Sequence, residues 1–168
     1  MAWDIVRVMD NQHRRIEWLL TESLGDENER SLDLDAYAAF RETMLRHIGI
    51  EERLLLAGLR DAQVMFGPAW AIHRDHAALA SLMSAEPDLA LVLEVARLVD
   101  THMTLEEGPE GLFSVCARSL SEEALVVGAH AYPEVKPAPW SKADWLPRTV
   151  QAALELAEGR LPPPHPHP

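Results

Sequence analysis

The chain has 168 residues, of which 48% are hydrophobic and 25% charged. This composition is typical of a single globular domain, and no apolar run approaches the roughly 20 residues that a membrane-spanning helix needs. Lys and Arg together number 15 against 27 Asp and Glu, which gives a formal net charge of -12. A surface this acidic repels phosphate groups, so we expect neither nucleic acid nor a membrane surface as a partner.

The single cysteine, Cys116, cannot form a disulfide within the chain. The N-terminal segment carries Asp4 and Asp10 where a secretory signal peptide has a basic flank followed by an apolar core. Both features favour a cytoplasmic protein.

Apolar residues recur every three or four positions along most of the chain, which predicts an all-α fold. Four long helices are expected at residues 2–24, 33–59, 68–85 and 87–107, with either Asp33 or Asp35 capping the second. Gly108 and Pro109 must end or kink the fourth helix because proline has no N–H to donate, and a helical extension can resume at Glu110.

The C-terminal third has a different pattern. A short helix from Ser121 to Ala131, a proline-rich extended segment at 132–140 and a last amphipathic helix at 147–158 are expected, followed by a flexible Pro/His tail. We therefore predict three regions: a metal-binding bundle at 1–118, a helical and proline-rich extension at 119–160, and a disordered tail at 161–168.

Six polar residues stand on the inner helix faces where the period predicts apolar ones: His13, His47, Glu51, His76, His102 and Glu106. On the second helix, for example, the stripe reads Tyr37, Phe40, Met44, His47, Glu51, Leu54. A buried carboxylate without a compensating charge costs several kcal/mol at least, and neutral imidazoles cannot supply that charge. Metal ions remove the conflict, since histidine nitrogen and glutamate oxygen are natural ligands of iron, manganese and zinc.

The two halves of this pattern repeat in the same order. His13 precedes a His-x-x-x-Glu-Glu segment that begins at His47, and His76 precedes another that begins at His102. The repeat predicts a two-metal centre with pseudo-twofold symmetry.

The same residues carry a family resemblance. His13, the HIGIEE segment from His47, the RDHAALASLM segment around His76 and the HMTLEE segment from His102 resemble the hemerythrin-like HHE cation-binding domain in order and spacing. The resemblance covers about residues 3–118 and implies an up-down-up-down four-helix bundle with a non-haem di-iron site. It also implies four terminal histidine ligands, and two bridging glutamates, Glu51 and Glu106, together with an oxo or hydroxo bridge.

The chain departs from the oxygen-carrying hemerythrins, which use five histidines, two of them spaced His-x-x-x-His on the third helix. Here His73 and His76 are three residues apart. His73 is open to three roles, as a fifth ligand, a partner of a ligand or a polar neighbour. Glu107 competes with Glu106 for the metal, whereas Glu52 is a solvated residue or an acceptor for a ligand. With four histidines, both irons could keep an open or water-filled position.

The resulting hypothesis is a di-iron protein that reacts with or senses O2, NO or peroxide, or handles iron in an oxidative-stress response. Manganese or zinc could replace the iron, and whether the protein is an enzyme stays open. One alternative is a metal-stabilised interaction module whose C-terminal segment, from about Ser119, docks onto another protein. A less favoured one is a zinc-dependent helical-bundle enzyme that uses three histidines, which leaves both buried glutamates without a role.

Overall fold

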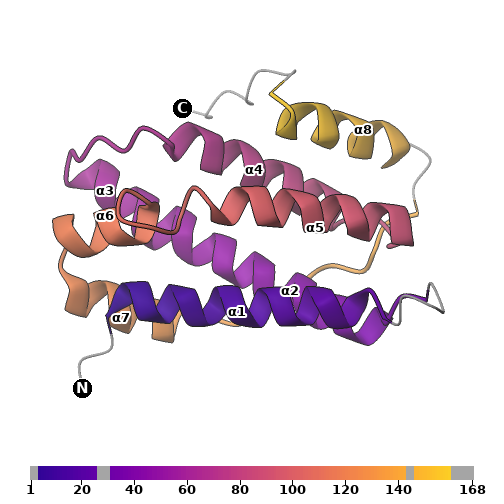
Figure 1. Cartoon of the computed structure of the whole chain (residues 1–168), viewed down its shortest axis with the longest axis horizontal. Helices are drawn as coiled ribbons and strands as arrows, with labels where there is room; N and C mark the ends of the chain where they lie inside the picture. Colours follow the sequence, from indigo (N-terminus) through magenta and orange to yellow (C-terminus); the bar gives the residue numbers. More distant parts are fainter. Residues whose placement is uncertain (1–3, 26–30, 143–145, 160–168) are drawn as a thin grey trace.

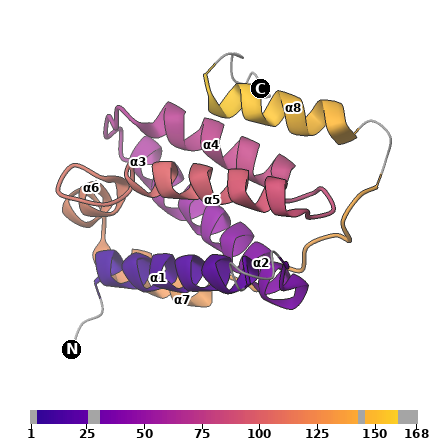
Figure 2. The ribbon, with the colours of Figure 1, turned by 45° about the vertical axis from the view of Figure 1, so that its right-hand side comes forward.

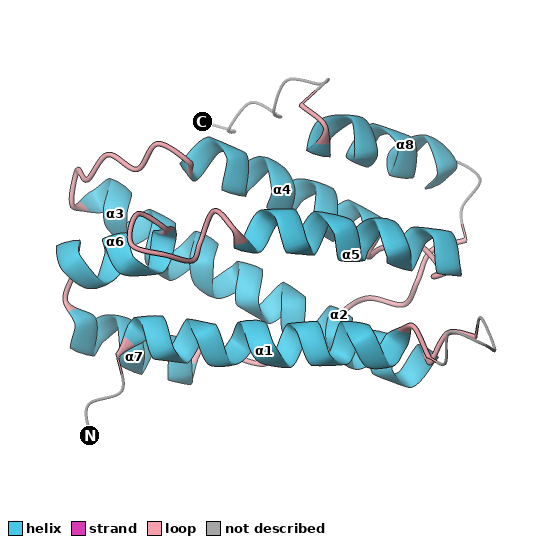
Figure 3. Ribbon diagram, in the orientation of Figure 1, coloured by secondary structure: helices cyan, strands magenta, loops and turns pink. Residues whose placement is uncertain are grey.

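The structure, a computed structural model, describes residues 4–25, 31–142 and 146–159, so the expected tail at 161–168 lies outside it. The described ranges are all-helical, which confirms the predicted class, and contain no strand (Figure 3). The helices are α1 Ile5–Ser23, α2 Leu34–Ile50, the π-helical segment η1 Glu51–Leu56, α3 Ala57–Asp61, α4 Ala69–Leu82, α5 Leu89–Met103, α6 Leu112–Ser119, α7 Glu122–Ala131 and α8 Leu146–Ala157 (Figure 1).

Side-chain caps set the starts of the long helices. Asp33, rather than Asp35, caps α2, because its Oδ1 accepts the backbone N–H groups of Asp35 and Ala36 at 3.0 and 2.9 Å. Asp88 caps α5 in the same way, accepting from the N–H of Leu91 at 2.8 Å. Aspartate competes well for N–H groups at the first turn of a helix, which is why these boundaries could be predicted to within two residues.

The fourth long helix is shorter than predicted. It ends at Met103 instead of Glu107, and the N–H groups of Leu105 and Glu106 bond to carbonyls only three residues back. Because Pro109 has no N–H, the carbonyl of Leu105 cannot be satisfied by a continuing helix. The chain instead turns back at Gly108, where φ is +83°, and the N–H of Leu112 reaches that carbonyl at 3.4 Å.

The helices pack as a bundle. Helix α1 lies along α2, and α4 lies along α5, while α8 covers the outer side of α4 (Figures 1 and 2). Helices α6 and α7 contact α1 at the same end of the bundle. This arrangement fits a helical bundle, and the strict up-down-up-down order stays a prediction. None of the helices in the described ranges is both long and apolar enough to cross a membrane.

The core consists of two apolar clusters with a polar layer between them. The first cluster includes Ile16, Phe40, Leu79 and Val95. The second includes Met9, Ile50, Ile72 and Phe113. His13 lies between Met9 and Ile16 on α1, and His76 lies between Ile72 and Leu79 on α4. The apolar clusters therefore enclose the polar inner residues from both ends of the bundle.

The segment after α7 runs across the bundle without helical structure, as the prolines predict. The Arg46 guanidinium donates to the carbonyls of Ala129 and Tyr132, and Arg41 donates to the carbonyl of Ala138 at 2.7 Å. These contacts attach the segment to α2. The predicted division of the chain at residue 118 stays a prediction.

Candidate metal centre

The six inner polar residues come together in the middle of the bundle. Each of them is at most 3% exposed, and they come from α1, α2, η1, α4, α5 and the turn that follows α5. They form two clusters in which the ligand atoms all lie within 4.8 Å of one another. One cluster holds His13, His47, Glu51 and Glu106, and the other holds Glu51, His76, His102 and Glu106. Both glutamates belong to both clusters.

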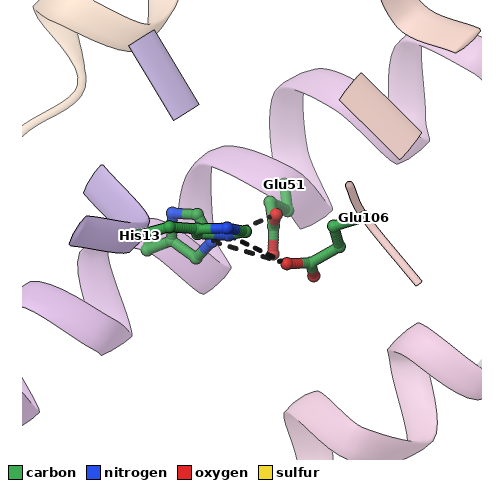
Figure 4. A group of neighbouring side chains, drawn as sticks. His13, Glu51 and Glu106 are labelled. Carbon is green, nitrogen blue, oxygen red and sulfur yellow. Dashed lines mark hydrogen bonds and ion pairs between the residues drawn. The ribbon is translucent and has the colours of Figure 1, made fainter. Parts of the chain in front are cut away.

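In the first cluster, the two imidazoles face the two carboxylates. The distance from His13 Nε2 to Glu106 Oε2 is 3.1 Å, and that from His47 Nε2 to Glu51 Oε1 is 3.2 Å. The two Nε2 atoms are themselves 3.1 Å apart. Figure 4 shows His13, Glu51 and Glu106 turned toward a common point.

The second cluster uses the other oxygen of each carboxylate. His76 Nε2 is 2.9 Å from Glu51 Oε2, and His102 Nε2 is 2.6 Å from Glu106 Oε1. Each glutamate therefore offers one oxygen to each pair of histidines, which is the arrangement of a carboxylate that bridges two metal ions.

A pair of metal ions fits these donors. Two ligands at about 2.1 Å from one ion lie about 3 Å apart when they subtend a right angle, close to the separations above. Several buried ligand atoms have a close neighbour of opposite charge but no hydrogen bond of acceptable geometry among the described residues: Glu51 Oε1, His102 Nε2, Glu106 Oε1 and Glu106 Oε2. Buried acceptors normally find a partner, so a cation would satisfy atoms that the protein itself leaves unsatisfied.

A π-helical segment begins at Glu51. The wider turn of a π-helix shifts the residues that face the core, and such segments are frequent at functional sites. Leu55 is therefore fully buried, whereas Leu54, which the sequence placed on the inner stripe, is only partly buried and packs near Gly128 of α7. Leu54 nevertheless packs against the second apolar cluster, so both leucines face the core.

The residues whose roles were left open lie just outside the two clusters. Glu52 Oε1 accepts from Nδ1 of His76 at 2.6 Å and from Nδ1 of His73 at 2.8 Å. Glu107 Oε1 accepts from Nδ1 of His13 at 2.7 Å. The side chains of His73 and Glu107 are each 51% exposed, and neither residue belongs to a cluster. Glu107 therefore contacts the centre directly at His13, whereas His73 reaches it only through Glu52 and His76.

Two further residues were not singled out from the sequence. The Nδ1–H of His47 donates to Gln12 Oε1 at 2.9 Å, and Asp75 Oδ2 lies 3.6 Å from His102 Nδ1. Each directly precedes a histidine of the centre, Gln12 before His13 and Asp75 before His76. The repeat between the two halves therefore includes the residue before each of these two histidines.

The buried imidazoles and carboxylates favour one another's charged forms when no metal is bound. Burial alone lowers the pKa of His47, but Glu51 and Glu106 outweigh it and raise that pKa to about 9. Burial likewise opposes protonation of His76, yet the nearby carboxylates of Glu106 and Glu51 raise its pKa well above the ordinary value. Burial raises the pKa of Glu106, but His102 and the other imidazoles lower it well below its usual range. Protonated histidines thus supply positive charge where a metal would.

Comparison with protein families also supports a metal-binding centre. Residues 4–113 match the family described as the hemerythrin HHE cation binding domain. The chain belongs to this family. The resemblance seen in the sequence is thereby confirmed, and a hemerythrin HHE domain implies metal binding, typically of iron. No curated protein and no solved structure is a significant match to the chain.

Proposed function

We propose that this hemerythrin-like protein binds two iron ions, with Glu51 and Glu106 bridging them. His13 and His47 would hold one ion, and His76 and His102 the other. The observation that carries the proposal is that each buried carboxylate directs one oxygen to each histidine pair. Bound iron would supply redox chemistry and affinity for small oxidising ligands.

The ligand count favours a reactive centre over a closed structural one. Two histidines and two glutamate oxygens give each ion four protein donors, fewer than the six that iron can accept. Neither residue four positions from His76 is a histidine, because these positions hold Ile72 and Ala80. We propose that O2, NO or peroxide reacts at the positions that remain open.

The protein's own part is to hold the ligands and to exclude bulk water. The Phe113 ring lies 5.0 Å from the His13 ring and 6.3 Å from the His47 ring, and the two apolar clusters enclose the centre. A dry, preorganised site of this kind strengthens electrostatic interactions and protects reactive species from side reactions.

The test is anaerobic loading of the metal-free protein with iron(II), followed by a metal count and absorption spectra before and after adding O2, NO or hydrogen peroxide in separate samples. We expect two irons per chain and a spectral change with at least one of the three. The double variant Glu51→Gln/Glu106→Gln should lose the iron pair. His130→Asn, which removes a histidine on α7 away from the centre, should retain it.

Two results would overturn the proposal. A single tightly bound zinc that persists without His13 would support the zinc enzyme instead. Two bound metal ions whose absorption spectrum does not change with O2, NO or hydrogen peroxide would support the metal-stabilised interaction module.

A further inference from the structure

We infer that the two metal positions are inequivalent, and that the position at His76 and His102 binds the first ion more tightly because Asp75 stands behind His102. This inference rests on the proposed two-metal centre.

The pseudo-twofold repeat makes the comparison possible. In each cluster the histidine Nε2 atoms face the centre, and the outer Nδ1 atoms face a second layer of acceptors. The outer nitrogens of His13 and His76 meet the same type of group, since Glu107 and Glu52 are both carboxylates that accept a bond of 2.7 and 2.6 Å. Those two histidines are therefore matched.

The other two histidines are not matched. His47 donates to the neutral amide oxygen of Gln12 at 2.9 Å, whereas Nδ1 of His102 faces the Asp75 carboxylate at 3.6 Å. The 3.6 Å separation is an ion-pair distance, and within the described residues neither Asp75 Oδ2 nor His102 Nδ1 has a hydrogen-bond partner. The symmetry of the centre is thus broken by one carboxylate in place of one amide.

Asp75 is held in place for this contact. It is fully buried, and its other oxygen, Oδ1, accepts bonds of 2.9 and 2.7 Å from the Arg74 guanidinium. The guanidinium offsets part of the carboxylate charge and fixes its orientation, which leaves Oδ2 directed at His102. A buried carboxylate with one oxygen anchored and one oxygen facing an imidazole acts as a positioning group.

A carboxylate behind a metal-bound histidine fixes its tautomer and makes the imidazole a stronger donor than an amide does. Loss of such a partner typically weakens metal binding by about 10- to 100-fold. The ion held by His76 and His102 has two carboxylates behind its histidines, Glu52 and Asp75. The ion held by His13 and His47 has one, Glu107.

The test is calorimetric titration of the metal-free protein with cobalt(II) alone, with the visible spectrum of the cobalt recorded at each step. We expect a tighter and a weaker binding step. Asp75→Asn should weaken the tighter step by about 10- to 100-fold and leave the weaker step in place. Gln12→Glu, the reciprocal and nearly isosteric change at a partly exposed residue, should strengthen the weaker step.

Variants of the histidine ligands show which metal position is filled in each binding step. His102→Ala should abolish the tighter step, and His47→Ala the weaker one. Circular dichroism of each metal-free variant checks that it is folded. If Asp75→Asn does not fold, Gln12→Glu still tests the inference. Two bound cobalt ions with both steps unchanged in Asp75→Asn and Gln12→Glu would overturn the inference and leave the two-metal centre intact. Absence of cobalt binding in the unaltered protein would overturn both.

Discussion

The position of Glu106 depends on a glycine five residues later. A Cβ added to Gly111 would lie 2.2 Å from the carbonyl oxygen of Glu107 and 2.4 Å from that of Glu106. Both contacts are with backbone, so the turn after α5 would have to move. We expect Gly111→Ala to lower the free energy of unfolding by about 1–3 kcal/mol and to reduce the iron bound per chain, measured by urea unfolding and metal analysis.

Gly67→Ala is the matched control, because a Cβ there meets no atom within 4 Å. This variant should stay within about 0.5 kcal/mol of the unaltered protein and bind the same amount of iron. If Gly111→Ala also bound two irons, the turn would not be what fixes the Glu106 carboxylate.

At the level of single residues, the six members of the centre could be predicted because each interrupts an apolar stripe. Gln12 and Asp75 could not, although they lie in the same layer. A residue next to a histidine in a helix is rotated by about 100° around the helix axis from it. A polar residue at that position is therefore predicted to lie on the solvated flank of the helix. Only the position of a neighbouring helix decides whether that flank faces water or another histidine.

Among whole elements, the helix starts were better predicted than the helix interiors and ends. Starts depend on local chemistry, as with the Asp33 cap, whereas the π-helical segment at Glu51 changes hydrogen-bond register without any proline or glycine to mark it. The end of α5 depends on a long-range exchange, since the carbonyls of Leu105 and Glu106 are satisfied by α6. Helical period alone contains no information about either.

Helix α7 and the segment after it act as part of the bundle. Leu125 and Ala129 are buried in the second apolar cluster, and Glu122 accepts the backbone N–H of Ile5 at 3.0 Å. We expect removal of residues 119–168 to lower the free energy of unfolding, measured with urea, by at least about 2 kcal/mol. Truncation of a single buried leucine already costs about 2–5 kcal/mol.

The same truncation addresses the interaction-module hypothesis. A chain that ends at Arg118 and is as stable as the full chain would mean that the C-terminal segment is dispensable for the bundle and free to serve a partner. A strongly destabilised chain would mean that the inner face of α7 is already occupied by α1 and η1.

For the whole molecule, the charges of the metal-free centre make stability depend on pH. The pKa of His47 is raised to about 9, so its contribution is fully present below the unfolded value of about 6.5 and is lost as pH rises through about 9. Burial alone would raise the pKa of Glu52, but His73 and His76 lower it to about 2. That contribution is present above the unfolded value of about 4.5 and is lost as pH falls through about 2. The metal-free protein should therefore be most stable between about pH 4.5 and 6.5.

Metal binding should shift this optimum upward. An ion can bind the histidines only in their deprotonated form, so metal competes with the protons that balance the glutamates in the metal-free protein. The stabilisation gained on loading should then increase from about pH 5 to about pH 9, because protons leave the histidines while the metal stays. Urea unfolding of metal-free and zinc-loaded protein across this range measures the difference, with zinc chosen because it does not change oxidation state. A difference that stays constant with pH would show that the histidines are not protonated before the metal arrives.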